Sequence, residues 1–145
     1  MDINTHLVVA LQKLFITLSK SAGQNLHSLG ITGSEFIIMT HLNVCASESV
    51  QKLAEVAMIS SGTATYTINK LEKRNYVTRK QDLADRRIFR VIITPEGKDY
   101  IMKILGPHMH YMEWLLGDFS NDQKKEFIDK IKYFGKTIEK KEIEK

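Results

Sequence analysis

The sequence has few of the residues that would support several common classes of protein. It contains one cysteine, Cys45, in 145 residues, which excludes an internal disulfide framework and fits a reducing compartment. Its apolar runs are short, as in Phe36-Ile37-Ile38-Met39, and none approaches the length needed to cross a bilayer. The first residues, MDINTHL, lack the basic and apolar regions of a secretion signal. We therefore expect a cytoplasmic protein that does not associate with a membrane.

The chain has two prolines and no low-complexity linker, and it is 43% hydrophobic and 26% charged. This composition is typical of an ordered globular protein, and the length suffices for one domain with a sizeable core. The formal net charge of +4 is mildly basic. A polyanionic partner is compatible with that charge, but the position of the basic residues is more informative than their number.

Helical periodicity dominates both ends of the chain. Apolar residues recur in steps of three and four through residues 3–29, which predicts a long amphipathic helix. Additional apolar residues lie off this stripe, and a second apolar face on a terminal helix usually packs against a partner. The off-stripe residues are Val8, Val9, Phe15 and Ile16. Thr94-Pro95-Glu96 has the form of a helix start, and Ser120 to Gln123 has the form of a capping box that opens the last helix.

Residues 49–74 have the pattern of two short helices joined by a tight turn, as in a helix-turn-helix. Ser49 and Ser60 are suited to cap the two helices. The apolar positions of the second helix, Ala64, Ile68 and Leu71, define its buried face. Methionine occupies position 58 in the turn, where such proteins often have glycine, so the sequence leaves the geometry of the turn open.

The opposite face of the second helix is rich in hydroxyl and amide groups. These groups can hydrogen-bond base edges in the major groove of DNA. A solvated polar face is the better explanation for an isolated helix, but this face is short of acids and is followed by the basic residues Lys73 and Arg74, which are suited to phosphates. The predicted DNA-facing residues are Ser60, Ser61, Gly62, Thr63, Thr65, Tyr66, Asn69 and Lys70.

A β-hairpin is predicted directly after these helices. The runs YVTRK and IFRVIIT are rich in β-branched and aromatic residues, and they enclose the polar loop QDLADRR. Adjacent arginines at a protruding tip are suited to the minor groove, where the negative potential is enhanced. A cluster of surface ion pairs is the alternative, and it would contribute little to stability.

These segments together resemble the MarR family of bacterial transcriptional regulators over nearly the whole chain. The likeness rests on LAEVAMISSGTATYTINKLEKRNYVTRK, then DLADRR, then ITPEGKDYI. It implies a mainly α fold with a small β-hairpin wing, in which residues of about 33–97 form a winged helix-turn-helix lobe. Helices of about 3–29 and 95–140 would join two copies into a homodimer that binds a pseudo-palindromic DNA operator.

The resemblance also implies that the two adjacent arginines of the wing have different roles. One arginine of the pair enters the minor groove, and the other is held by Asp85 through a bidentate pair. The sequence favours Arg86 for the groove and Arg87 for the aspartate, but it does not decide between them.

Members of this family are often repressors that a small aromatic, phenolic or quinone-type effector releases from DNA, and SSGTATYTINKLEKRNYV is most similar to the hydroquinone-responsive branch. The effector pocket is expected between the dimer helices and the winged lobe. Ordinary core packing is the alternative for each candidate lining residue. The candidates are Phe15, His27, Phe36, His41, Met109 and Met112.

Thiol and metal sensing are the other regulatory alternatives. Redox-sensing members usually carry their cysteine near the N-terminus, so a structural or incidental role is favoured for Cys45. His108 and His110 lie two residues apart, on different faces of a helix, and cannot chelate together. His41 and His108 are the histidines that could meet, but no third ligand at a suitable spacing is evident. We predict no metal site and no cofactor.

An enzyme is not expected from this sequence. It offers no activated nucleophile, no phosphate-binding glycine loop and no pair of carboxylates in an apolar setting. A helical interaction protein that does not bind DNA is the remaining alternative. We predict a sequence-specific DNA-binding regulator, most simply a dimeric repressor.

Overall fold

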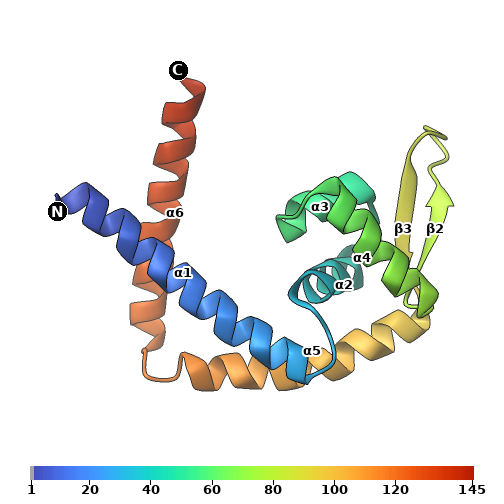
Figure 1. Ribbon diagram of the computed structural model, residues 1–145, viewed down its shortest axis with the longest axis horizontal. Helices are drawn as coiled ribbons and strands as arrows, with labels where there is room; N and C mark the ends of the chain where they lie inside the picture. Colours follow the sequence, from blue (N-terminus) through green and yellow to red (C-terminus); the bar gives the residue numbers. More distant parts are fainter. Residues whose placement is uncertain (1) are drawn as a thin grey trace. The chain divides into compact units, whose positions relative to one another are not determined.

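The computed structural model describes residues 2–145. It divides into two compact units, one that runs to Met109 and one that comprises His110–Lys145. Within the described residues, six helices and three short strands follow one another along the chain. Figure 1 shows the helices and the two strands of the wing hairpin. In order they are α1 (Ile3–Ser28), α2 (Gly33–Cys45), β1 (Ser47–Ser49), α3 (Val50–Ala57), α4 (Ser61–Lys73), β2 (Val77–Gln81), β3 (Phe89–Ile93), α5 (Pro95–Leu115) and α6 (Asn121–Ile143). The mainly helical fold with a small sheet is confirmed.

Hydroxyl side chains start three consecutive helices. Thr32 precedes α2, where its Oγ1 accepts a hydrogen bond from the Glu35 backbone at 3.2 Å and its own N–H donates to Glu35 Oε2 at 2.9 Å. Ser49 caps α3 by accepting from Lys52 N, and Ser60 caps α4 by accepting from Thr63 N, both at 3.1 Å. Each cap satisfies a backbone donor that the first helical turn leaves unpaired, so local sequence determines these starts.

The sheet has one strand more than the predicted hairpin. β2 pairs with β3 in antiparallel fashion, from Val77 opposite Ile93 to Gln81 opposite Phe89. β1 lies on the other side of β3, so the strand order is β1-β3-β2. The sequence Ser47-Glu48-Ser49 has no alternation of apolar and polar residues, and its strand conformation depends on the partner that β3 provides.

The core of the first unit lies among α2, α3, α4, the sheet and the first half of α5. The predicted inward-facing residues of α4, Ala64, Ile68 and Leu71, are completely buried. Ile68 and Leu71 belong to one apolar cluster with residues of α1, α2, α3, α5, β2 and β3. Its other fully buried members include Ile38, Met39, Leu42, Leu53, Val91 and Ile101.

The segment from Thr94 to Gly97 joins the wing to α5. Thr94 Oγ1 donates to the Asn75 carbonyl at 2.6 Å and accepts from Gly97 N at 2.9 Å. A Cβ atom at position 97 would lie 2.1 Å from the Tyr76 carbonyl oxygen, far inside van der Waals contact. Glycine at this position therefore allows α5 to begin against the backbone that follows α4.

The first and last helices, α1 and α6, expose much of their apolar surface. In α1 the sole buried residue is Leu26, and in α6 none is buried, among the residues that the structure describes. The large exposed apolar side chains of these helices include Leu7, Val8, Leu11, Leu14, Phe15, Ile16, Phe127, Ile128, Ile131, Phe134 and Ile138. Across residues 2–145, no helix combines the length and the apolar character that crossing a membrane requires.

Candidate nucleic-acid interface

Helix α4 presents the predicted DNA-facing residues to solvent. All eight of them are exposed, and Tyr66 exposes 65% of its surface. Thr67 is the polar residue of this helix that is buried, and its hydroxyl donates to the Thr63 carbonyl. The helix thus has one buried face and one exposed face, and the exposed face carries hydroxyl, phenol, amide and ammonium groups suited to base edges and phosphates.

The first turn of α4 is suited to an approaching phosphate. It contains no acidic residue, and the unpaired N–H groups of a helix start attract anions. A Cβ atom at Gly62 would find nothing within 4 Å, so this part of the helix is open to close approach. The hydroxyls of Ser60 and Thr63 lie 2.9 Å apart and are hydrogen-bonded to each other before any DNA contact.

The turn between α3 and α4 has the geometry of a glycine turn despite its methionine. Met58 lies in the left-handed region with φ 52° and ψ 44°, and its N–H donates to the carbonyls of Ala54 and Glu55. A residue with a Cβ pays a conformational cost there that glycine avoids. The turn therefore has the left-handed geometry that glycine usually adopts in helix-turn-helix proteins, although methionine adopts this conformation less favourably.

Arg79 of β2 connects the wing to α4. Its Nη1 donates to Glu72 Oε2 and its Nη2 donates to Asn69 Oδ1, each at 2.6 Å. This pairing neutralises the single acid of α4 and occupies the Asn69 oxygen, so the Asn69 amide hydrogens are left to reach a base or phosphate. Sequence reasoning missed Arg79, because its partners lie seven and ten residues away on a different element.

The basic residues at the end of α4 differ in their surroundings. Lys70 Nζ lies 3.4 Å from the buried carboxylate of Glu35. Arg74 stacks over the rings of Tyr76 and Tyr100 and donates to the Tyr100 hydroxyl at 3.1 Å. Lys73 is exposed, and its side chain forms no ion pair or hydrogen bond within residues 2–145. Of these three basic residues, Lys73 is therefore the least engaged by the protein itself.

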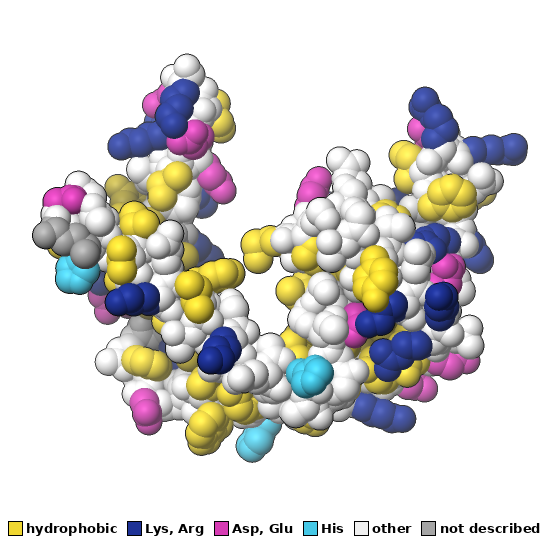
Figure 2. All heavy atoms as spheres, viewed as in Figure 1, with side chains coloured by type: hydrophobic (Ala, Val, Ile, Leu, Met, Phe, Trp, Pro, Cys, Tyr) yellow, Lys and Arg dark blue, Asp and Glu magenta, His cyan; other side chains and the backbone are white. Residues whose placement is uncertain are grey.

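Two aspartates shape the tip of the wing. Asp82 Oδ1 accepts from the backbone N–H groups of Ala84 and Asp85, at 2.8 and 3.2 Å, and these bonds lower the pKa of Asp82. Asp85 Oδ1 accepts from the backbone of Arg87 at 3.0 Å. Lys and Arg side chains project from this tip in Figure 2, at the upper right of the view. Hydrogen bonds from the backbone to these two carboxylates therefore hold the loop in a defined turn, from which basic side chains project.

Asp85 pairs with Arg87 rather than with Arg86. Arg87 Nε donates to Oδ1 and Nη2 donates to Oδ2, both at 3.1 Å, and the side-chain hydrogen bond from Arg87 lowers the pKa of Asp85. Arg86 is exposed and has no ion pair or hydrogen bond in the part of the chain that the structure describes. This pairing is the one that the sequence favoured, whereas the minor-groove contact of Arg86 stays a prediction.

Arg90 of β3 braces the base of the wing, and sequence reasoning missed it as well. Its Nε donates to Ser47 Oγ at 2.9 Å, and its Nη2 donates to the Ser47 carbonyl at 3.2 Å. Its Nη1 lies 3.7 Å from Asp82 Oδ2. These contacts join β1 to the wing loop, and they were invisible in the sequence because β1 itself was not predicted.

The predicted effector-pocket residues have diverse surroundings. His27 lines a hollow of about 220 Å³ together with Glu35, Lys70 and Arg74. Phe36 instead packs edge-to-face on His108, with ring centroids 4.8 Å apart.

The other candidates do not line that hollow. His41 lies beside Glu48, and the side chains of Phe15 and Met109 are 64% and 50% exposed. Met112 belongs to the second unit. Among the predicted candidates, His27 is therefore the one that lines the hollow.

The two histidines considered for a shared metal have different partners. His108 is buried, and its Nδ1 lies 2.8 Å from Asn25 Oδ1, an oxygen that can only accept, so Nδ1 carries the proton. Burial lowers the pKa of His108. His41 Nε2 lies 3.7 Å from Glu48 Oε2. A site built on His41 with His108 therefore finds no support in these contacts.

Comparison with known proteins decides the family. Residues 31–89 match the model of the MarR family. The HTH-type transcriptional regulator SarZ of Staphylococcus epidermidis is 32% identical over 100 residues, which cover 66% of this chain and 68% of SarZ. The chain belongs to the MarR family. It is accordingly a DNA-binding transcriptional regulator with a winged helix-turn-helix, and not an enzyme.

Two further relatives agree with this assignment. The HTH-type transcriptional regulator MhqR of Bacillus subtilis is 25% identical over 130 residues, covering 85% of this chain and 90% of MhqR. The crystal structure of AbsC, a MarR family regulator from Streptomyces coelicolor, shares the fold with a TM-score of 0.83 at 18% identity, covering 96% of both chains. Identities at this level do not assign an effector branch, so the hydroquinone-responsive branch stays a prediction.

Proposed function

We propose that this MarR-family regulator is a homodimeric repressor that reads the major groove with residues 60–70 and the minor groove with Arg86. The observation that carries the proposal is the polar exposed face of α4, whose single acid is paired with Arg79, beside a wing whose Arg86 has no intramolecular partner in the described chain. An unpaired guanidinium at a protruding tip loses no protein contact when it binds a narrow groove, where the negative potential is strong.

The major-groove contact rests on the exposed side chains of α4. Tyr66 and Thr65 stand on the exposed face, and Arg79 orients the amide of Asn69 by occupying its oxygen. Phosphate contacts from Lys73 and from the start of α4 would set the register of the helix without reading sequence. Arg74 and Lys70 would contribute less, because Tyr100 and Glu35 already engage them.

The proposed dimer is supported by the exposed apolar surface of helices α1 and α6. Leu7, Leu11 and Leu14 of α1 are each more than 40% exposed, and Phe127, Ile131 and Phe134 of α6 are each 46% exposed. Exposed apolar residues repeated at helical spacing indicate burial against a partner. In such a dimer the two recognition helices would meet half-sites about one DNA turn apart, roughly 34–36 Å. We assign residues of about 33–97 to the DNA-binding lobe and about 3–29 and 95–140 to dimerisation.

A small aromatic, phenolic or quinone-type effector is the proposed release signal. The hollow next to His27 supports this class, since Lys70, Arg74 and His27 offer donors for a phenolate or carboxylate oxygen. Lys70 and Arg74 belong to α4 and its end, so a ligand held there would act directly on the DNA-reading helix. Binding would shift the population from DNA-competent to incompetent dimers.

The experiment that tests this function is selection of bound DNA fragments by the purified protein, followed by fluorescence anisotropy on the selected sequence. We expect a pseudo-palindromic site, and we expect Tyr66→Ala to reduce the preference for that site over random DNA. Sedimentation should show a dimer at micromolar concentration. Selection of no common sequence, or unchanged preference in Tyr66→Ala, contradicts the assignment of α4, and a stable monomer contradicts the dimer.

The effector is tested on the same complex. Titration with a panel of hydroquinones and salicylate-type acids should release the labelled operator, and His27→Ala should require a higher concentration of the same compound. Release that is identical in His27→Ala and wild type would remove the hollow from consideration as the effector site.

A further inference from the structure

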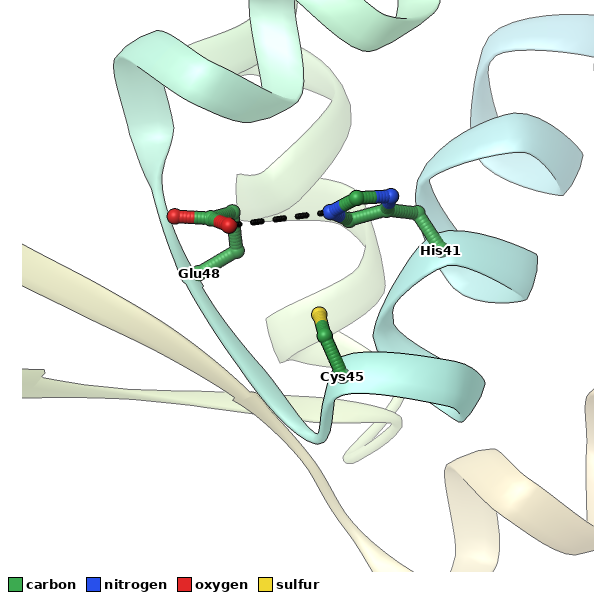
Figure 3. Close-up of side chains that lie close together, drawn as sticks. All are labelled: His41, Cys45 and Glu48. Atoms are coloured by element: carbon green, nitrogen blue, oxygen red, sulfur yellow. Dashed lines mark ion pairs between the residues drawn. The ribbon is translucent and has the colours of Figure 1, made fainter.

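We propose that His41, Cys45 and Glu48 form a binding site for a zinc-like divalent transition-metal ion. Figure 3 shows the three side chains turned toward one another where α2 ends and β1 begins. Their candidate ligand atoms, an imidazole nitrogen, the thiol sulfur and a carboxylate oxygen, all lie within 4.8 Å of one another. The proposal is independent of the DNA-binding function.

The spacing of the three atoms is close to that of a tetrahedral site. Zinc bonds of about 2.0–2.3 Å place neighbouring ligand atoms about 3.3–3.8 Å apart. His41 Nε2 and Glu48 Oε2 are already separated by 3.7 Å. The longest separation among the three atoms would have to shorten by about 1 Å, which needs only small side-chain rotations around an ion.

Backbone geometry brings the three residues together. His41 and Cys45 are four residues apart, so they share one face of the last turn of α2. The next residue, Ala46, has φ 65° and reverses the direction of the chain. β1 then pairs Glu48 with Val91 of β3, which holds the carboxylate beside the helix end. The sequence search for a third ligand missed Glu48 because its position depends on this turn and on β1.

An unsatisfied nitrogen faces the cluster. His41 Nε2 is buried and has no hydrogen-bond partner among the residues that the structure describes. Its 3.7 Å separation from Glu48 Oε2 is too long for a hydrogen bond. Leaving a buried polar atom unpaired is costly, and a metal bond to the bare nitrogen removes that cost.

The second oxygen of Glu48 is held from outside the cluster. Oε1 accepts a hydrogen bond from the Ser49 backbone at 2.8 Å and lies 3.9 Å from Arg90 Nη2. These contacts leave Oε2 directed at His41. Outer hydrogen bonds of this kind orient the ligands of metal sites.

The donor set selects the class of metal. One thiolate, one imidazole and one carboxylate suit zinc and neighbouring transition metals, whereas calcium and magnesium bind sites made of oxygen alone. Cys45 is exposed, so an ion can enter from solvent and keep a water as its fourth ligand. A bound ion would join the end of α2 to β1 and, through Arg90, to the base of the wing.

Cobalt(II) titration of the chelator-treated full-length protein tests the site. We expect one Co²⁺ per chain, with the near-ultraviolet charge-transfer band of a cobalt–thiolate bond and the strong visible bands of four-coordinate cobalt, and we expect Zn²⁺ to displace it. Cys45→Ser should abolish the charge-transfer band. His41→Ala and Glu48→Gln should weaken binding at least about 10-fold, because removal of even an outer hydrogen-bond partner of a metal ligand has an effect of that size. His110→Ala, which removes an exposed histidine outside the cluster, should bind like wild type.

Thiol reactivity provides a second measurement that needs no variant. Because Cys45 is the single cysteine, the rate of its reaction with a disulfide reagent reports on this site alone. Zn²⁺ should slow the reaction at least about 10-fold, and excess chelator should restore it. An unchanged rate at saturating Zn²⁺, absence of the charge-transfer band, or equal cobalt affinity in His41→Ala and wild type overturns the proposal. Operator binding by the metal-free protein is measured in parallel, so failure of the metal site leaves the DNA-binding result standing.

Discussion

Arg87 donates two hydrogen bonds to the carboxylate of Asp85, Nε to Oδ1 and Nη2 to Oδ2, each 3.1 Å long. Its neighbour Arg86 has no such partner in the described chain. Arg87 is exposed and Asp85 is half-buried at the surface, so the pair adds little to stability and serves mainly to shape the loop. The two arginines should consequently differ in their importance for DNA binding.

Arg86→Ala is expected to weaken operator binding by about 1–3 kcal/mol, roughly 5- to 150-fold, because the groove contact is lost. Arg87→Ala should weaken it less, through a loosened loop. Fluorescence anisotropy on the selected operator at moderate salt measures both affinities. A larger loss in Arg87→Ala than in Arg86→Ala reverses the assignment of the two roles.

Lys73→Ala should weaken binding to all sequences equally and reduce the slope of log affinity against log salt by about 1, because one phosphate contact and its released counterion are lost. Lys73 is exposed and unengaged in the described chain, so its removal costs the protein no internal contact. Lys132→Ala, an exposed lysine of α6, is the matched control and should leave the slope unchanged. An unchanged slope in Lys73→Ala means that this residue does not reach the DNA.

Gly97→Ala should lower the free energy of unfolding by about 3 kcal/mol or more, because its Cβ would lie 2.1 Å from the Tyr76 carbonyl oxygen and the backbone must move. Urea denaturation followed by circular dichroism measures the change. Gly62→Ala is the control, since its Cβ meets nothing within 4 Å, and alanine there should stabilise α4 by up to about 1 kcal/mol. Equal stability of the two variants would contradict the close approach at Gly97.

Met58→Gly should raise the free energy of unfolding by about 1 kcal/mol, because glycine adopts φ 52° without a steric cost. Met58→Ala keeps a Cβ in the same conformation, and the methionine side chain is 79% exposed, so alanine should be nearly neutral. Thermal denaturation of the three proteins side by side checks this order. Stabilisation by alanine as large as by glycine would point to the side chain rather than to the backbone.

His108 should make stability depend on pH. Burial between Asn25 and Phe36 lowers its pKa from the ordinary value of 6.5, so the folded state favours the neutral ring. The unfolded state therefore binds more protons as the pH falls below 6.5. This contribution to stability is complete above pH 6.5 and declines as the pH falls toward the folded pKa, at no more than about 1.4 kcal/mol per pH unit.

Urea denaturation between pH 7.5 and 5.5 measures this dependence. His108→Gln should show a smaller loss of stability than wild type over the same range, whatever its absolute stability. Parallel curves for the two proteins would mean that His108 does not titrate differently in the folded and unfolded states.

Periodicity and capping in the sequence were enough to predict most of the fold. Ser49 and Ser60 cap the helices that they were expected to cap, and Ala64, Ile68 and Leu71 face the core. These features depend on residues within one or two helical turns, so the local sequence is enough to predict them. β1 was missed because Ser47 to Ser49 forms a strand only where β3 supplies its hydrogen bonds.

The sequence by itself determined the family likeness, the order of the helices and the wing hairpin, and the exposed polar face of α4. The tertiary structure decided which wing arginine Asp85 holds, how Arg79 ties β2 to Asn69, and where Glu48 meets His41 and Cys45. The physical reason lies in the range of the interactions. A hydrogen bond between Arg90 and Ser47 joins residues 43 positions apart, and only the folded sheet brings such groups within reach.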